Sequence, residues 1–309
     1  MSCLLGTTFA LRQRDPAEGL PNADLVRDEA MRCEATGLLL CEGLPPELLV
    51  PLVAQLRRDT TLPIVAVDGQ LGASWRGRPQ LARACLGSLD RDEARAALER
   101  SLAALELAAE GGAQAVWLRL GEVAAVAARW DGLRRRFLRG ELLSDPEPAQ
   151  ALMQQRCAAA APHLGACLRG LERLARAAEQ RGLQLLVRNP RRALELPTPA
   201  ELSVLRLELA GAPLSPLLDV PAAHLGSAMR LVPLRETITA FCDGPLCLLG
   251  DACGALGALP PGQGEVDVAA VARALPTHTQ VAFVPWPGLH LSEVALGCQR
   301  VASLPRRTG

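Results

Sequence analysis

The segment Leu183–Gly226, LQLLVRNPRRALELPTPAELSVLRLELAGAPLSPLLDVPAAHLG, decides the fold that the sequence predicts. It contains two short apolar runs, 183–187 and 214–218, whose length and composition are typical of buried strands. Each run ends in polar residues, with Arg188 after the first and Asp219 after the second. Polar groups at the ends of two apolar strands indicate where the chemistry of this segment lies.

A helix is predicted between the two strands, and its start is well marked. Thr198 is suited to cap the first turn, Pro199 has its φ angle preset for the first helical position, and Glu201 can reach back to the cap backbone N–H. Strand, helix and strand in this order make one βαβ unit.

The remainder of the chain repeats the alternation of strand and helix from end to end. The sequence predicts eight strands, at Cys3–Phe9, Gly37–Cys41, Leu62–Val67, Ala113–Leu120, Leu183–Val187, Leu214–Leu218, Thr237–Cys242 and Gln280–Val284. None alternates between apolar and polar residues as a half-exposed strand would, so we predict one α/β domain over residues 1–309, a single parallel (β/α)8 TIM barrel. A doubly wound open sheet is the alternative, but no glycine-rich phosphate loop follows the first strand.

Two regions depart from this regular pattern. Residues 121–143 are predicted to be an irregular helical insertion, with one helix at Val123–Leu138 that carries the basic run Arg134–Arg136. A capping box of Ser144 and Glu147 then predicts a long helical region to residue 180, with a break at Pro162.

Composition excludes several classes of protein. The chain of 309 residues has 33 basic and 33 acidic residues, so no net field attracts nucleic acid or an anionic membrane. No run of about 20 apolar residues is free of charge or proline, and the N-terminus lacks the pattern of a signal peptide. The ten cysteines form no Cys-x-x-Cys pair, which favours buried free thiols. We therefore expect a cytoplasmic protein without a membrane partner.

In a TIM barrel the functional groups lie at the carboxyl ends of the strands. The polar residues predicted there to bind a ligand are Arg119, Arg188, Asn189, Asp219, Asp243 and Trp286. Two arginines in such a group favour an anionic ligand, for example a phosphate or a carboxylate. Glu42, Asp68 and His224 are the candidates for acid/base catalysis.

Four stretches resemble the xylose isomerase-like TIM barrels, the superfamily of sugar phosphate isomerases/epimerases and endonuclease IV. They are LGSLDRDEARAALERSLAALELAAEGGAQAVWLRLG, LERLARAAEQRGLQLLVRNP, PTPAELSVLRLELAGAPLSPLLDVPAAHLG, and ITAFCDG together with PPGQGEVDVAAVARAL. Together they cover about two-thirds of the chain. The resemblance implies the same barrel and a small sugar or sugar phosphate as the ligand.

The metal site of that family does not carry over to this sequence. The resemblance implies a divalent metal held by Glu, Asp, His and Glu after strands five to eight. These positions fall on Arg188, Asp219, Ala240 and Val284, of which only Asp219 can bind a metal. We therefore predict that the chain has no divalent metal and no other cofactor. We also predict that Arg188 takes the metal position and pairs with Asp219; alternatively, Arg188 lines a loop.

Three alternative functions are compatible with a barrel of this kind that lacks the metal ligands. The first is a metal-independent binding protein, or pseudoenzyme, that holds a sugar-like or phosphorylated ligand. The second is an active metal-independent isomerase or epimerase that uses Glu42, Asp68 or His224 as acid and base. The third, nucleic-acid binding through 134–136 and Arg139, is disfavoured by the zero net charge and the 3% aromatic content. A homodimer is possible, with the insertion as one contact.

Overall fold

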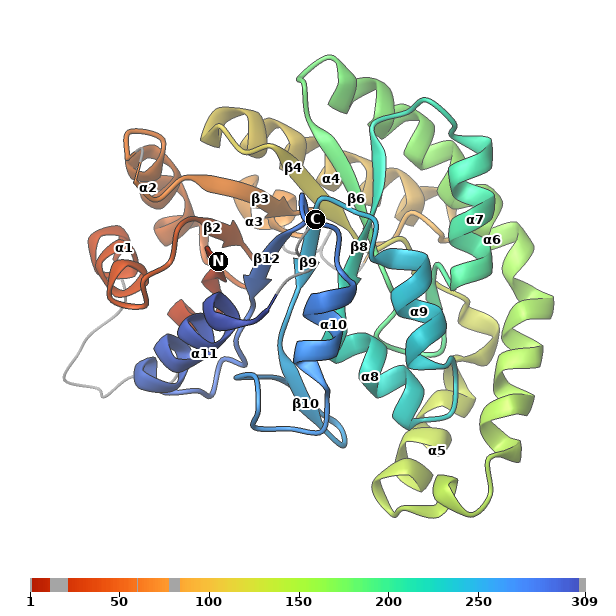
Figure 1. Ribbon diagram of the computed structural model, residues 1–309. Helices are drawn as coiled ribbons and strands as arrows, with labels where there is room; N and C mark the ends of the chain where they lie inside the picture. Colours follow the sequence, from red (N-terminus) through yellow and green to blue (C-terminus); the bar gives the residue numbers. More distant parts are fainter. Residues whose placement is uncertain (1, 12–21, 60, 78–83, 306–309) are drawn as a thin grey trace.

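The computed structural model describes residues 2–11, 22–59, 61–77 and 84–305. Eight parallel strands close into a barrel in the order β1-β12-β9-β8-β6-β4-β3-β2, with helices outside it (Figure 1). The barrel strands are β1 (Leu4–Gly6), β2 (Leu38–Leu40), β3 (Ile64–Asp68), β4 (Ala115–Leu118), β6 (Gln184–Arg188), β8 (Leu214–Asp219), β9 (Leu246–Leu248) and β12 (Gln280–Phe283). The predicted (β/α)8 TIM barrel is confirmed.

Helices and two small sheets complete the described structure. The helices are α1 (Ala23–Arg32), α2 (Pro46–Leu56), α3 (Leu71–Trp75), α4 (Arg91–Gly111), α5 (Ala127–Leu138), α6 (Glu147–Glu179), α7 (Pro199–Glu208), α8 (Val220–Ala228), α9 (Leu234–Phe241), α10 (Val268–Ala274) and α11 (Leu291–Ser303). Two antiparallel pairs stand outside the barrel, β5 (Gly121–Glu122) with β7 (Glu195–Leu196) and β10 (Asp251–Cys253) with β11 (Leu256–Leu259). None of the helices in the described part of the chain has the length and apolar character that crossing a membrane requires.

The period of two along each strand decides which side chains reach the barrel mouth. On β6, Leu185 and Val187 pack outward against the helices, whereas Leu186 packs among the side chains that fill the barrel. Arg188, two residues after Leu186, therefore faces inward at the open end. The same spacing from Leu217 on β8 makes Asp219 an inward-facing residue. Both charges are thus placed at the mouth by strand geometry.

The predicted helix start signal is correct on α7, and α4 has well-defined caps as well. Thr198 accepts from the Glu201 backbone N–H, and the Glu201 side chain accepts from the Thr198 N–H at 2.8 Å, which completes the capping box. Asp90 caps α4, and Gly112 ends it with a left-handed φ of 72°.

The prediction of strand seven at Thr237–Cys242 was wrong. Residues 234–241 form the helix α9, and the seventh barrel strand is β9, which starts four residues after the end of the predicted strand. The threonines, isoleucine and phenylalanine of this stretch suit a strand locally. However, Leu234, Thr237, Ile238 and Phe241 recur at helical spacing, and that face packs into the core, so tertiary packing overrides local propensity.

The long helical region was predicted correctly in extent but not in detail. No side chain caps the start of α6, because the hydroxyl of Ser144 donates to the Glu141 carbonyl instead. The helix also runs without a break through Pro162 (Figure 1). Pro162 itself is exposed, while Ala160 and His163 on either side are buried. Packing on both sides of the proline holds the helix together.

The insertion at 121–143 contains more order than expected. It begins with β5, whose antiparallel partner is β7, and continues into α5. Trp130 and Leu133 on α5 are buried against α6 and form part of a separate small core. Two of its arginines are in ion pairs, Arg136 with Asp145 at 2.7 Å and Arg139 with Glu141 at 2.6 Å. These pairs reduce the free positive charge that a nucleic-acid surface would need.

Candidate functional site

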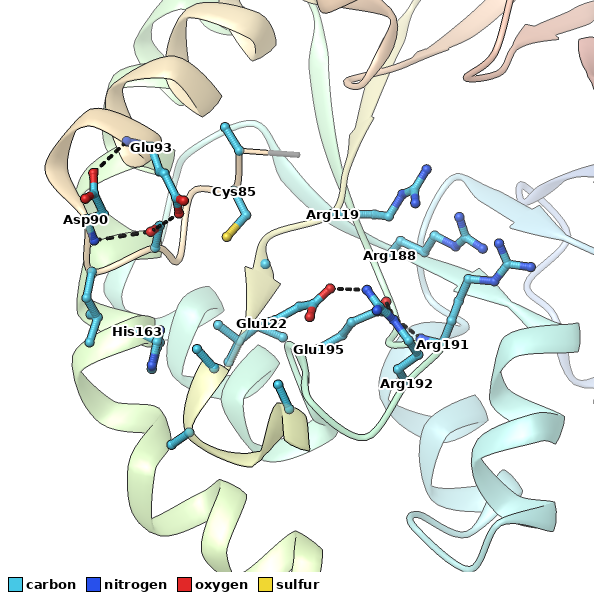
Figure 2. Close-up of a pocket in the computed structure, with 18 of the residues that line it drawn as sticks. Cys85, Asp90, Glu93, Arg119, Glu122, His163, Arg188, Arg191, Arg192 and Glu195 are labelled. Carbon is cyan, nitrogen blue, oxygen red and sulfur yellow. Dashed lines mark hydrogen bonds and ion pairs between the residues drawn. The ribbon is translucent and has the colours of Figure 1, made fainter. Parts of the chain in front are cut away.

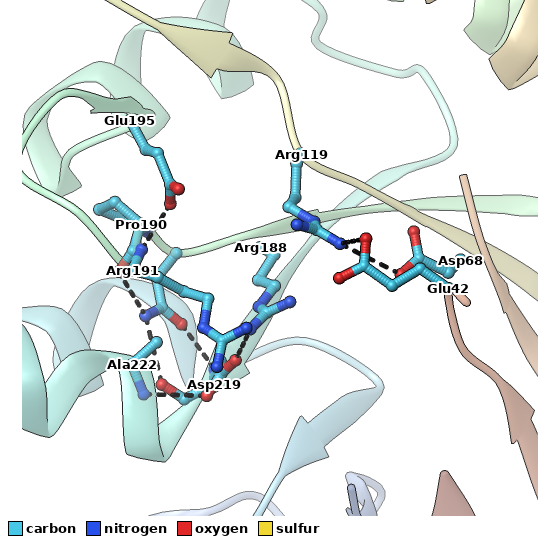
Figure 3. Close-up of polar contacts among 10 residues, drawn as sticks. Glu42, Asp68, Arg119, Arg188, Pro190, Arg191, Glu195, Asp219 and Ala222 are labelled. Atoms are coloured by element: carbon cyan, nitrogen blue, oxygen red, sulfur yellow. Dashed lines mark hydrogen bonds and ion pairs between the residues drawn. The ribbon is translucent and has the colours of Figure 1, made fainter. Parts of the chain in front are cut away.

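An ion pair between Arg188 and Asp219 lies across the ends of β6 and β8 (Figure 3). The side chains are 8% and 6% exposed, so the pair is buried inside the mouth. The second oxygen of Asp219 accepts from the Ala222 backbone N–H at 3.0 Å and caps α8. The predicted pairing of Arg188 with Asp219 is therefore present in the structure.

Asn189 ties the same two strand ends together. Its side-chain oxygen accepts from the Asp219 backbone N–H at 2.5 Å, and its amide donates to the Asp219 carbonyl at 3.2 Å. Asn189 is 2% exposed, and these two bonds satisfy both of its polar groups. It fixes Asp219 opposite Arg188 and also lines the cavity described below.

A second charged group forms at the ends of β2, β3 and β4. Arg119 is paired with Glu42 and lies 3.6 Å from Asp68 (Figure 3). Burial raises the pKa of Asp68, and the neighbouring Arg119 offsets part of this rise. For Arg119, burial acts against the charge, but the carboxylates of Asp68 and Glu42 together outweigh it and raise the pKa. Two of the predicted acid/base candidates thus share one guanidinium.

Two further arginines were missed in the sequence. Arg191 and Arg192 follow Asn189 and Pro190 in the loop after β6, and both line the cavity. Arg192 pairs with Glu122 and with Glu195, the latter at 2.8 Å. The Arg191 guanidinium forms no ion pair within the described ranges. The pKa of Arg191 is lowered, mainly by the nearby charge of Arg188 and to a smaller extent by burial. The run RNPRR directly after a strand was the signal in the sequence.

These arginines border a cavity of about 780 Å³ (Figure 2). It begins over Arg119 and Arg188 at the mouth and extends outward between the start of α4, the middle of α6 and the β5–β7 pair. The Nε atoms of Arg119 and Arg188 are buried and have no hydrogen-bond partner among the described residues. Both side chains line the cavity, and a guanidinium has five N–H donors, so the N–H groups that are not paired are suited to bind an anionic ligand.

Six predicted site residues are not among those that line this cavity. Glu42, Asp68 and Asp219 are next to it, ion-paired with or close to arginines that do line it, whereas Asp243, His224 and Trp286 lie elsewhere. Asp243 precedes β9 instead of following a strand, so it lies at the opposite end of the barrel, where it pairs with Arg206 at 2.8 Å. Its placement at the mouth was wrong because strand seven was misplaced. His224 lies on α8, 3.4 Å from Glu265, in a separate groove beside α5. Trp286 follows β12 and is half exposed, outside the cavity lining.

The donor set at the barrel mouth does not fit a divalent cation. With strand seven corrected, the inward-facing residue at its end is Leu248, which replaces Ala240 as the matched position. Arg188, Leu248 and Val284 cannot bind a metal, and the carboxylate of Asp219 is already paired with a guanidinium. Among the described residues, no group of three or more His, Cys, Asp or Glu side chains is arranged to hold a metal ion.

Comparison with protein-family models and with curated proteins finds no match for the sequence. Solved structures do match it over nearly the whole chain. A D-tagatose 3-epimerase-like protein has 14% sequence identity and a TM-score of 0.65, with 98% of this chain and 96% of that one covered. An L-ribulose 3-epimerase has 13% identity and a TM-score of 0.64, with 98% and 93% covered.

A third match extends the likeness to an isomerase by name. A putative xylose isomerase from Rhodospirillum rubrum has 15% identity and a TM-score of 0.64, with 99% of each chain covered. At these identities the matches concern the fold and not the activity. The chain has the fold of the xylose isomerase-like TIM barrels.

Proposed function

We propose that this protein binds a small phosphorylated sugar in the cavity at the barrel mouth without a divalent metal. The observation that carries the proposal is Arg188, a buried guanidinium at the end of β6 that is ion-paired with Asp219. Arg188 also lines the cavity, and its guanidinium has N–H donors beyond the one directed at Asp219. An anionic group on the ligand suits these donors.

Arg191 strengthens the argument for an anion. Arg191 is an exposed residue whose guanidinium forms no ion pair within the described ranges, and the nearby charge of Arg188 lowers the pKa of Arg191. Two like charges held together are stabilised by an anion between them, and a phosphate can accept from both. The sugar part of the ligand is inferred from the names of the structural neighbours, which include sugar epimerases.

Binding of inorganic phosphate, glucose 6-phosphate and glucose, measured by isothermal titration calorimetry, tests the proposal. Both phosphates are expected to bind, and glucose is expected to bind much more weakly. Arg191→Gln is expected to weaken phosphate binding by about tenfold or more, as the loss of one charge-assisted hydrogen bond does. Arg206→Gln, which removes an arginine at the opposite end of the barrel, is the matched control and should bind as the parent protein does.

The same titrations test metal independence. Binding of glucose 6-phosphate should be the same with EDTA as with Mn²⁺. The proposal fails if EDTA abolishes binding, or if glucose binds as tightly as its phosphate.

A metal-independent isomerase or epimerase is the second candidate, and Asp68 favours it. The Asp68 carboxyl is 3% exposed, has a raised pKa because of burial, and lies beside Arg119 at the mouth. A carboxyl with this environment can accept and return a proton next to a carbonyl group. Glu42, on the same arginine, would be its partner, whereas His224 in the groove beside α5 would take no part.

Exchange of carbon-bound hydrogen for deuterium distinguishes the two candidates. An isomerase or epimerase incorporates deuterium from D2O into a ketose phosphate, which proton NMR detects. Incorporation by the parent protein, and its loss in Asp68→Asn, would replace the binding proposal by the catalytic one. A binding protein leaves the sugar unlabelled.

A further inference from the structure

The cavity has two chemically different ends. Figure 2 shows four arginines on one side, Arg119, Arg188, Arg191 and Arg192, and the acidic residues Asp90 and Glu93 with His163 on the other. Cys85 and Glu122 lie between them. The arginine end is the anion site proposed above. The outer end has its own polar groups, and an anion bound at the arginine end would make no hydrogen bond to them.

His163 is the best-defined polar group of the outer end. It lies in the middle of α6, is 6% exposed, and forms part of the cavity wall. Its Nδ1 is 2.7 Å from the Gly87 carbonyl, which can only accept, so Nδ1 carries a proton and donates. In the neutral ring this fixes Nε2 as an acceptor.

Nε2 belongs to a side chain that lines the cavity. No hydrogen-bond partner of Nε2 occurs within the described ranges, and Nε2 is not among the polar atoms that are sealed without a partner. The anchor of the ring is rigid, because the Gly87 N–H donates to the Leu120 carbonyl at 2.8 Å. A nearly buried histidine in the cavity wall thus keeps an acceptor that has no partner among the described residues.

The carboxylates near His163 have local donors but keep free acceptor capacity. Asp90 accepts through Oδ1 from the N–H groups of Asp92 and Glu93, and Glu93 accepts through Oε2 from the Ser88 hydroxyl at 2.6 Å. Each carboxylate has about four acceptor positions, so Oδ2 of Asp90 and Oε1 of Glu93 remain available. The outer end is therefore lined by acceptors, and it suits a ligand that donates several hydrogen bonds.

We propose that the outer end binds a second sugar ring, so that the ligand of this protein is a phosphorylated disaccharide. The phosphate lies against Arg188 and Arg191, and hydroxyl groups of the distal ring donate to His163 Nε2 and to the carboxylates. The volume is consistent with this, since cavities of about 300–1,000 Å³ hold ligands larger than one sugar. The inference rests on the proposed function and names its ligand class.

Calorimetric titration with glucose 6-phosphate and with trehalose 6-phosphate tests the second ring, because the two probes share the phosphate. The parent protein is expected to bind the disaccharide phosphate roughly threefold to tenfold more tightly, the gain of one or two hydrogen bonds. His163→Asn keeps a donor near the position of Nδ1 and removes the acceptor at Nε2, so it should lose most of this preference. It should bind glucose 6-phosphate as the parent does.

Matched variants separate ligand recognition from a structural role of the ring. His163→Gln, which places a polar atom near the position of Nε2, should retain more of the preference than His163→Asn. His278→Asn, an exposed histidine before β12, should change nothing. If both His163 variants fail to fold, Glu93→Gln, an exposed substitution on α4, should still reduce the preference.

Three results would overturn the second-ring site. They are equal affinity for the two probes, tighter binding of glucose 6-phosphate, and an equal weakening of both probes in His163→Asn or Glu93→Gln. All three leave the anion site intact. Failure of both probes and of inorganic phosphate to bind would instead refute the proposed function itself.

Discussion

At the scale of single residues, the buried pair of Arg188 and Asp219 dominates the barrel mouth. Removing two charges from water costs free energy, and their attraction together with further hydrogen bonds offsets that cost. Asp219 has such bonds to the Ala222 N–H and, through its backbone, to Asn189. The pair is therefore tolerated, but neither member is tolerated alone.

Arg188→Met is expected to lower the free energy of unfolding by about 3–5 kcal/mol, because it leaves the carboxylate of Asp219 buried without a counter-charge. Asp219→Asn in the same chain removes that charge and keeps an acceptor for the α8 cap. The double variant should thus be more stable than Arg188→Met alone. Urea unfolding of the parent, both single variants and the double variant measures the coupling, and strictly additive losses would contradict it.

The environment of Asp68 predicts a dependence of stability on pH. Burial raises the pKa of Asp68 in the folded state, so folding binds protons as the carboxyl titrates. The stability that Asp68 contributes is complete below its unfolded pKa and is lost as the pH rises through the higher folded pKa. Asp68→Asn, which cannot ionise, should therefore gain stability relative to the parent as the pH rises from acid to neutral.

Unfolding of the parent and of Asp68→Asn across this pH range checks the sign. Asp243→Asn is the control, since Asp243 is about half exposed and pairs only at the surface. A stability of Asp68→Asn that stays constant or falls relative to that of the parent as the pH rises would contradict the assigned shift.

At the scale of elements, α6 connects the insertion to the barrel and carries His163 into the cavity wall. Pro162 stands in its interior, where it removes one backbone donor and crowds the preceding turn. Pro162→Ala should stabilise the protein by about 2 kcal/mol, because the helix penalty of about 3 kcal/mol exceeds the roughly 1 kcal/mol by which proline restricts the unfolded chain.

Thermal unfolding measures this change, and Pro148→Ala is its matched control. Pro148 is the second residue of α6, where a backbone N–H has no partner within the helix, so its replacement should have a much smaller effect. A melting temperature of Pro162→Ala at or below that of the parent would show that the proline supports the local structure.

At the scale of the whole molecule, the barrel is closed by the first and last strands, since β1 pairs with β12. The side chains that fill the barrel include Trp117, which is 2% exposed, while Trp130 belongs to the small separate core around α5. Two tryptophans thus report on the barrel and on the insertion.

Variants that keep only Trp117 or only Trp130 should unfold at the same urea concentration if residues 1–309 form one cooperative domain. The rigid connection through α6 and the β5–β7 pair is the physical reason to expect this. Far-UV circular dichroism of the parent should give the same midpoint. An earlier transition at Trp130 would mean that the insertion unfolds by itself.

The sequence by itself determined the barrel, because seven of the eight strands and most of the helices between them follow local periodicities that can be read without a structure. It also located Arg188, Asp219, Arg119 and Asp68, because each of these residues ends or directly follows a strand, and all parallel strands end on the same side. The pairing of Arg188 with Asp219 followed from this placement.

Only the tertiary structure decided the rest of the site. Strand seven was misplaced because the residues at 234–241 suit a strand and a helix equally, and only packing against the core selects α9. Arg191 and His163 meet in one cavity although they lie on separate elements, a loop and a long helix. Local pattern fixes which face of an element is apolar, whereas the surroundings of its polar residues depend on how distant segments pack together.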